Sequence, residues 1–251
     1  MTSTDQQRLS RVLSHDLAAL VRSARQLSAY AREDVLREDA DSAMHAIGML
    51  DVRLANIDRF VSELIRFYRA GERPYRAEPF SITELIHALF KNMCPQEDAQ
   101  LRLMCTRDVM IADRQLVQTT LRELMKNAVT HRDSSVGIQI SVEVTHCDDQ
   151  TVSIGVEDNG PGVAESLIGT VKQPFVKANG RGNSGSAGLG LAICERDLNA
   201  AGGTLHVRNG EHAGVRAEFR IPGGLEAAAN NRGRPMIEPV DKAQRPKLKA
   251  V

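Results

Sequence analysis

Two stretches near the start of the chain place apolar residues three and four positions apart. In residues 5–32 this spacing predicts an amphipathic helix with one face packed on other helices. In residues 42–70 the spacing alternates between four and three without a break, which is the heptad pattern of a coiled-coil-like seam. The polar segment 33–42 predicts a turn, so the two helices form a hairpin. The apolar positions are Leu13, Leu17, Leu20, Ala24, Leu27 and Ala31 in the first helix and Ala43, Ile47, Leu50, Leu54, Ile57, Val61, Leu64 and Tyr68 in the second.

A hairpin alone buries only part of each stripe. The pattern therefore predicts that two hairpins pair into a four-helix bundle, which makes the protein a homodimer. The alternative is a hairpin that packs on the second domain of its own chain. His15 falls roughly 160° from the centre of the first stripe, at about 100° per residue. It is expected to point outward, toward solvent or a partner.

Glycine and two prolines end the helical pattern in residues 71–80, which predicts a linker. Beyond it, segments with a period of two alternate with helical ones, which predicts a mixed sheet with helices on one face, an α/β sandwich. Ser81 and Asp113 are the expected helix N-caps, and Gly202-Gly203 is a C-cap signal. The expected helices are 82–93, 114–131 and 188–201, and the expected strands are 101–105, 109–112, 137–146, 151–157, 204–208 and 215–221.

The predicted fold class is α+β. A helical hairpin occupies residues 1–70, the linker 71–80, and the α/β sandwich 81–222. Residues 223–251 contain three prolines, with six Lys or Arg against three Asp or Glu, and show no sustained apolar period. We expect this tail to be disordered.

Composition narrows the class of protein without identifying it. The chain has 32 Lys and Arg residues together and 32 Asp and Glu residues together. Its net charge therefore gives no electrostatic preference for nucleic acid or for a membrane surface. No apolar run is long enough to span a bilayer, and the first residues lack the apolar core of a signal peptide. The four cysteines show no spacing typical of a zinc site, and reduced thiols are expected. We therefore expect a soluble, cytoplasmic protein.

Three separated motifs are the candidates for chemistry, and the first surrounds Asn127. This residue lies one helical turn after Glu123 and one turn before His131, so the three share a face. An amide oxygen is a hard, neutral ligand that suits Mg²⁺ held jointly with phosphates. The alternative is that these polar residues merely solvate the exposed face of a helix.

The second motif, Asp158-Asn159-Gly160-Pro161-Gly162, directly follows an apolar strand. A carboxylate at a strand end can accept a hydrogen bond from an adenine amino group, and glycines let the backbone approach a flat base. An ordinary turn is the alternative, because Asp-Asn-Gly also suits turns.

The third motif places Gly185, Gly188 and Gly190 before and at the start of an alanine-rich helix. Glycine inside a helix costs about 1 kcal/mol relative to alanine. Close approach of a phosphate to the helix N-terminus would explain that cost. The motif is neither a P-loop nor a Rossmann fingerprint, because no GK[ST] follows it and no strand leads directly into it.

In this order, ELMKNAVTH, EDNGPG, PFVK and GSAGLGL resemble the N, G1, F and G2 boxes of the sensor histidine kinases. That family shares a Bergerat-type ATP-binding domain with gyrase, Hsp90 and MutL. The segment SHDLAAL on the hairpin resembles the family's dimerisation and phosphotransfer domain, so the resemblance covers residues from about 8 to 222. It implies an ATP-dependent protein-histidine kinase that uses ATP and Mg²⁺ and passes its phosphoryl group to the receiver domain of a response regulator. A separate sensor or regulator protein is a further candidate partner.

The resemblance implies a role for each matching residue. His15 would accept the phosphoryl group, with Asp16 as the adjacent acid. Asn127 would hold Mg²⁺ with help from Glu123, and Asp158 would recognise adenine. Residues from about 164 to 187 would form the mobile ATP lid. The other implied nucleotide-binding residues are Lys126 and His131 near Asn127, Gly160 and Gly162 beside the base, Phe175 and Lys177 in the F box, and Gly185, Gly188, Leu189 and Gly190 around the phosphates.

Four positions depart from the family pattern, and one of them is Ser186, which replaces the first glycine of the usual GxGLGL with Gly185 one place early. Ala19 stands where relatives carry the Thr or Asn that positions water for dephosphorylating the regulator, so phosphatase activity is not expected. Leu20 replaces a proline, which should leave the first helix less kinked. Thr130 replaces a lysine common among relatives, so Lys126, His131 or Arg132 would supply that charge.

Two other functions remain open at this stage. One is a histidine phosphotransfer or scaffold protein with a vestigial ATP domain, against which the intact Asn127, Asp158 and glycines argue. The other is a Bergerat-fold ATPase or serine kinase, such as the anti-sigma-factor kinases. Those proteins lack the hairpin with its histidine.

Overall fold

The computed structural model describes residues 15, 17–95, 99–132, 136–148, 150–177, 187–210, 214–226 and 236–237. The chain divides into two compact units. The first comprises Met1–Arg73 with Gly169–Arg196, and the second Pro74–Ile168 with Asp197–Val251. Over the described part of the chain, every helix is too short or too polar to cross a lipid bilayer.

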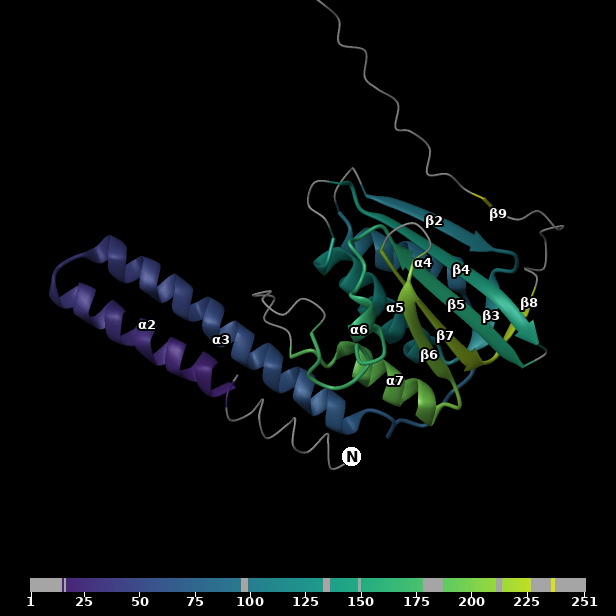
Figure 1. Ribbon diagram of the computed structural model, residues 1–251, viewed down its shortest axis with the longest axis horizontal. Coiled ribbons are helices and arrows are strands. Elements are labelled where there is room, and N and C mark those ends of the chain that lie inside the picture. Colours follow the sequence, from purple (N-terminus) through teal and green to yellow (C-terminus); the bar gives the residue numbers. More distant parts are fainter. Residues whose placement is uncertain are drawn as a thin grey trace, which may run out of the picture. The chain divides into compact units, whose positions relative to one another are not determined.

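The predicted hairpin is the main feature of the first unit (Figure 1). It consists of α2 (Ala18–Leu36) and α3 (Ala40–Arg69), which pack against each other along their length. The most buried side chains of the paired stretch are alanines, and small side chains let two helices approach closely. These alanines are Ala24 and Ala31 of α2 and Ala43 and Ala46 of α3.

The turn of the hairpin is shorter than the predicted segment 33–42. Helix α2 continues to Leu36, and α3 begins at Ala40 with Asp39 as its cap, whose side chain accepts a hydrogen bond from the N–H of Ser42 at 3.0 Å. The predicted turn was too long because polar residues are tolerated in the exposed last turn of a helix as well as in a loop. One of them even supports the helix, since Arg37 pairs with Glu33 at 2.6 Å.

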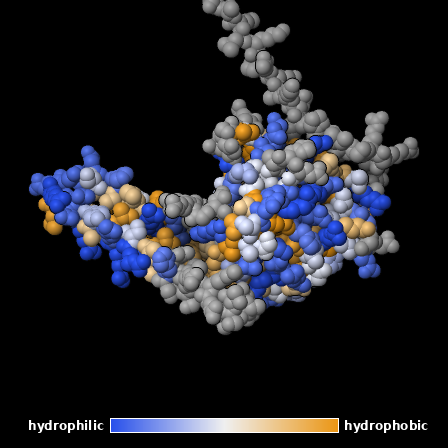
Figure 2. All heavy atoms as spheres, in the orientation of Figure 1, coloured by the Kyte–Doolittle hydropathy of each residue, from blue (hydrophilic) through white to orange (hydrophobic). Residues whose placement is uncertain are grey.

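Helix α3 carries two apolar faces. One is buried and includes Phe60 and Phe67, at 4% and 2% exposure. The other contains much of the predicted heptad seam and is exposed, with Ile47 at 40%, Leu54 at 50%, Val61 at 39% and Tyr68 at 46%. In Figure 2, apolar residues reach the surface along the hairpin. The described chain therefore leaves uncovered the face that the sequence assigns to a partner hairpin.

A six-stranded mixed sheet forms the centre of the second unit, in the order β6-β7-β5-β4-β2-β9. Only β2 and β4 pair in parallel, and the other neighbours are antiparallel. The predicted mixed sheet is confirmed. Its strands are β2 (Gln100–Cys105), β4 (Gln139–Asp148), β5 (Thr151–Asp158), β6 (Thr204–Asn209), β7 (Val215–Pro222) and the two-residue β9 (Met236–Ile237).

The alternation along the central strands sorts apolar from polar residues onto the two faces. Val152, Ile154 and Val156 of β5 are buried at 3% or less. The other face carries charged groups, and Arg216 of β7 bridges Glu143 and Glu157 at 2.7 and 3.3 Å. Helices α4 (Ile82–Met93) and α5 (Arg114–Thr130) cover the apolar face, as Figure 1 shows.

A second, three-stranded sheet was not expected. Its strands are β1 (Glu78–Ser81), β3 (Val109–Ala112) and β8 (Gly224–Glu226), in the order β1-β3-β8. The predicted linker therefore ends in a strand, and the prediction of disorder is wrong for residues 224–226, as it is for the two residues of β9. Both short strands form because β3 offers each of them an edge, a long-range pairing that local composition does not reveal.

The predicted helix ends are confirmed where a cap was named. The side chain of Ser81 accepts a hydrogen bond from the N–H of Glu84 at 3.1 Å, and that of Asp113 accepts one from the N–H of Leu116 at 2.9 Å. The C-terminal signal also holds, since Gly202 adopts a φ of +78° and the Gly203 N–H donates to the Leu198 carbonyl at 2.8 Å.

Asp113 fixes more than one helix end, so its removal should destabilise the second unit. Its carboxylate also accepts a hydrogen bond from the Arg76 N–H at 2.8 Å, and the residue is 1% exposed. We expect Asp113→Ala to lower the free energy of unfolding by about 2–3 kcal/mol, as measured by urea unfolding followed by circular dichroism. Asp113→Asn keeps one acceptor oxygen but turns an NH2 group toward the second backbone N–H, so it should lose less stability than Asp113→Ala. Equal losses in both variants would contradict the capping role.

Candidate functional site

Asp158 is the last residue of β5, in the middle of the six-stranded sheet. Its Oδ1 accepts hydrogen bonds from the N–H groups of Gly160 and Val215 at 2.8 and 3.2 Å. Burial raises the pKa of Asp158 above its ordinary value of 3.8, although these two bonds and the nearby His131 lower it. Because both bonds go to Oδ1, Oδ2 is the oxygen that can accept a hydrogen bond from a ligand.

The glycines around Asp158 are required by the protein's own packing. A Cβ at Gly160 would lie 2.9 Å from the Asp158 Oδ1, and Gly162 has a φ of +77°. A Cβ at Gly214 would lie 1.9 Å from the Asp158 carbonyl oxygen, which no rearrangement of a side chain could relieve. The sequence analysis assigned Gly160 and Gly162 to contact with a base. The structure adds that they also let the backbone fold tightly around the carboxylate.

Two asparagine side chains hold this turn in place. Asn159 accepts from the Gln139 N–H and donates to the Gly137 carbonyl, both at 2.9 Å. Asn209 clamps Val163 in the same two-sided way, at 2.9 and 2.8 Å. An amide side chain that satisfies both groups of a loop backbone fixes that loop without a regular ladder.

Helix α5 presents the first motif beside this turn. Glu123 is 5% exposed and its Oε2 lies 3.4 Å from the Nζ of Lys126, while Asn127 is half-buried one turn later. The C-terminal end of the helix reaches the Asp158 turn, since the His131 carbonyl oxygen lies 3.4 Å from the Cβ position at Gly160. The first and second motifs are therefore brought together.

The third motif belongs to the first unit, and its geometry depends on the F box. Gly188 has a φ of +71°, and a Cβ there would lie 2.8 Å from the Val176 carbonyl oxygen. The Phe175 N–H donates to the Gly188 carbonyl at 2.9 Å, and Phe175 itself has a φ of +65°. Leu189 is fully buried, and α7 (Gly190–Ala200) starts at Gly190. The loop 187–189, called the glycine loop below, therefore leads into the first N–H groups of a helix, which have no partner within that helix. Lys177 is exposed.

His15 is exposed and lies in a helical segment just before α2, as the sequence predicts. Two of the predicted site residues, Asp16 and Gly185, lie outside the described residues, as does the part of the predicted lid from 178 to 186. The described part of that lid contains one short helix, α6 (Glu165–Ile168).

In each unit taken by itself, the groups present suit one part of a nucleotide with a magnesium ion. Asp158 offers an acceptor at a position fixed by backbone N–H groups, and the start of α7 offers donors to an anion. Among the described residues, His, Cys, Asp and Glu form no cluster of three that could enclose a metal. A magnesium ion on Asn127 would therefore take further oxygens from phosphates and water, which is its usual coordination in nucleotide sites.

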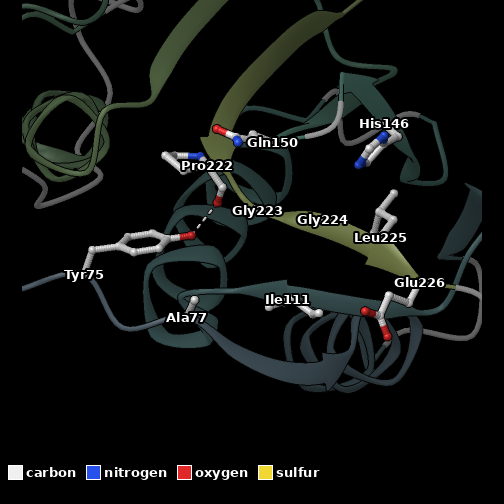
Figure 3. Close-up of a pocket in the computed structure, with 10 residues that line it drawn as sticks. All are labelled: Tyr75, Ala77, Ile111, His146, Gln150, Pro222, Gly223, Gly224, Leu225 and Glu226. Atoms are coloured by element: carbon white, nitrogen blue, oxygen red, sulfur yellow. Dashed lines mark hydrogen bonds between the residues drawn. The ribbon is translucent and has the colours of Figure 1, made fainter.

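A cavity of about 580 Å³ elsewhere in the second unit contains none of the predicted site residues. Figure 3 shows it beside β8, lined by the side chains of Tyr75, Ile111 and His146 among others. The Tyr75 hydroxyl donates a hydrogen bond to the Pro222 carbonyl. The cavity is thus lined by residues of the three-stranded sheet and of β4 and β7, and it lies apart from the predicted site residues.

Sequence reasoning missed the residues that support Asp158 from β6 and β7. Asn209-Gly210 and Gly214 are a recognisable turn signal, and the Gly210 N–H does bond to the Gly214 carbonyl at 3.0 Å. Nothing in the sequence shows that this turn lies against Asp158, because the pairing of β5 with β7 is a long-range contact.

Comparisons with known proteins agree with this geometry. Residues 112–224 match the family of histidine kinase-, DNA gyrase B- and HSP90-like ATPases. The chain is 28% identical over 209 residues to the alginate biosynthesis sensor protein KinB of Pseudomonas aeruginosa, an alignment that covers 81% of this chain and 33% of KinB. The chain spans about a third of the length of the curated relatives it matches first.

Two solved structures share the fold. The histidine kinase AdeS of Acinetobacter baumannii superposes with a TM-score of 0.61 at 18% identity, over 83% of this chain and 97% of that one. Full-length ShkA, whose structure is a complex with AMPPNP, gives a TM-score of 0.59 at 22% identity, over 85% of this chain and 46% of ShkA. Residues 112–224 thus match the histidine kinase-, DNA gyrase B- and HSP90-like ATPase family, and the chain as a whole is similar to sensor histidine kinases.

Proposed function

We propose that the protein is an ATP-dependent protein-histidine kinase that phosphorylates itself on His15 and passes the phosphoryl group to an aspartate of a response regulator. The observation that carries the proposal is the Asp158 carboxylate, held at the end of a buried strand by two backbone N–H groups inside the matched ATPase domain. His15, an exposed histidine on the helical hairpin, supplies the phosphoryl acceptor that other ATPases of this fold lack.

Each group of residues has a separate task in nucleotide binding. The Oδ2 of Asp158 accepts a hydrogen bond from the adenine amino group. The N–H groups at the start of α7 bind phosphate oxygens, and Asn127 holds the magnesium ion. When bound, Mg²⁺ neutralises charge on the phosphates. Phosphoryl transfer depends on such positioning and charge neutralisation more than on covalent help from the protein.

The transfer itself forms one bond and breaks another. A nitrogen of the His15 imidazole attacks the γ-phosphorus, the bond to the bridging oxygen breaks, and ADP leaves with the electron pair. The exposure of His15 lets the imidazole meet both a nucleotide and, afterwards, the receiver domain of a regulator. The phosphoryl group then moves to a carboxylate oxygen of the regulator, and the imidazole is regenerated.

Incubation with ATP labelled at the γ-phosphate and Mg²⁺ tests the reaction. The label should appear on the wild-type chain as acid-labile, alkali-stable phosphate, and it should be absent from His15→Gln. His45→Gln, at an exposed histidine of α3, is the matched control and should be labelled like wild type. Label that persists in His15→Gln would show that another residue is the acceptor.

We also propose that two chains pair through α3 and that the protein acts in the cytoplasm. The exposed heptad of α3 supports the pairing, since Ile47, Leu54, Val61 and Tyr68 repeat every seven residues along one face.

The four free cysteines fit a reducing compartment. Ala19 offers no polar group to orient a water molecule, which supports a kinase without phosphatase activity toward its regulator.

Pairing through this face predicts a specific sensitivity to charge. Leu54→Glu combined with Val61→Glu would bury two carboxylates in an apolar interface, so the dimer should give way to monomer in sedimentation equilibrium. Ser62→Glu, exposed on the same helix but outside the heptad, should leave the dimer intact. A double variant that stays dimeric at micromolar concentration would place the interface elsewhere.

Adenine recognition by Asp158 predicts both a mutational and a pH effect. Asp158→Asn replaces an acceptor with a donor and should weaken ATP binding by about 10- to 100-fold, as measured by calorimetry. Because the pKa of Asp158 is raised above 3.8, protonation removes the acceptor as the pH falls toward that raised value. Affinity of the wild type should therefore decrease on acidification more than that of Asp158→Asn.

Glu157, the residue before Asp158, provides the control for the predicted loss of ATP affinity. Glu157→Gln changes a side chain bonded to Arg216 on the polar face of the sheet and should bind ATP like wild type. Parallel pH profiles for wild type and Asp158→Asn would assign the pH effect to the nucleotide instead of to Asp158.

A further inference from the structure

Glu63 is an acidic residue buried among apolar side chains in the first unit. It lies on α3 at 7% exposure, between Phe60 and Phe67 of the buried face. An ionised carboxylate away from water is unfavourable unless hydrogen bonds compensate it. An apolar residue would suit this position on packing grounds alone, so the carboxylate calls for a specific explanation. The cluster consists of Phe60, Phe67, Ala70, Ala187, Leu189, Ala192 and Ile193.

One partner of Glu63 is the backbone of the glycine loop. Its Oε2 accepts a hydrogen bond from the N–H of Ala187 at 2.8 Å. Ala187 directly precedes Gly188, whose carbonyl accepts from the Phe175 N–H and whose φ is +71°. The loop that leads into α7 is therefore held from two sides, by the F box at Gly188 and by the hairpin at Ala187.

Other contacts of α3 hold the segments that flank this loop. The ring of Phe67 lies 6.3 Å from that of Phe175, measured between centroids. The guanidinium of Arg196, on α7, lies 4.5 Å above the Phe67 ring, and its NH1 donates to the Phe67 carbonyl at 3.2 Å. One face of α3 thus contacts the F box, the glycine loop and α7, and Glu63 makes the hydrogen bond nearest the glycines.

We propose that Glu63 is a positioning residue for the phosphates of the nucleotide: through the Ala187 N–H it holds the glycine loop in the conformation that receives them. The inference rests on the ATP binding proposed above. A loop that is already ordered loses less conformational entropy when the anion binds, so the hairpin raises affinity without touching the ligand. Any change that moves α3 away from Ala187 then weakens phosphate binding.

Three variants at one position separate the hydrogen bond from packing. Glu63→Gln keeps an acceptor oxygen and should bind ATP within about threefold of wild type. Glu63→Leu fills the same space without an acceptor and should bind ATP about tenfold more weakly, the effect of one lost hydrogen bond of ordinary strength. Asp58→Ala, at an exposed acid of the same helix, should bind like wild type.

Adenosine distinguishes loop positioning from general damage. It lacks phosphates, so Glu63→Leu should bind it as wild type does, whereas Asp158→Asn should bind both adenosine and ATP more weakly. Phe60→Leu perturbs the same cluster without removing the hydrogen bond and should keep wild-type affinity for ATP. If Phe60→Leu and Glu63→Leu lose ATP affinity equally, Glu63 contributes only packing and the inference fails.

Amide hydrogen exchange gives a readout that needs no nucleotide. In the nucleotide-free protein, the peptide that contains Ala187 should exchange faster in Glu63→Leu than in wild type, and at the wild-type rate in Glu63→Gln. Unchanged exchange and unchanged ATP affinity in Glu63→Leu would overturn the inference while leaving the kinase proposal intact. A wild-type chain that binds no ATP would overturn the proposed function itself.

Discussion

The burial of one carboxylate at the end of a central strand constrains the architecture of the second unit. Asp158 is removed from water far enough that its pKa rises, so backbone N–H groups must compensate its charge. Those groups come from the turn after β5 and from the first residue of β7. The turn must therefore be tight, the strands must pair in this register, and Gly214 must lack a Cβ. What results is an acceptor fixed in place before any ligand arrives.

A second constraint acts on α3, which carries apolar residues on two faces. A helix that is apolar on two sides is stable in water only when both sides are covered. One face meets the F box, the glycine loop and α7 within the first unit, and it includes the buried Glu63. The other shows an unbroken heptad at the surface. The pairing and the loop positioning proposed above would thus use two faces of one helix, and this helix would link assembly to nucleotide binding.

Local signals in the sequence predicted those elements whose cause is local. The caps Ser81 and Asp113 and the stop at Gly202-Gly203 act within a few residues of their position, and each was confirmed. The short strands β1 and β8 were missed because their partner, β3, is remote in the sequence. The acidic segment 33–42 was misjudged for a related reason, since its charges are compatible with both a turn and an exposed helix end.

The sequence by itself determined the helical hairpin, the mixed sheet and the three motifs, because periodicity and glycine placement reflect local backbone geometry. The tertiary structure decided which oxygen of Asp158 is committed to the protein, why Gly214 admits no side chain, and which backbone group Glu63 binds. Those answers depend on contacts between residues that lie far apart in the sequence, by 57 positions in one case and by 124 in another. Such contacts follow from how the chain folds back on itself, and no local pattern of residues encodes them.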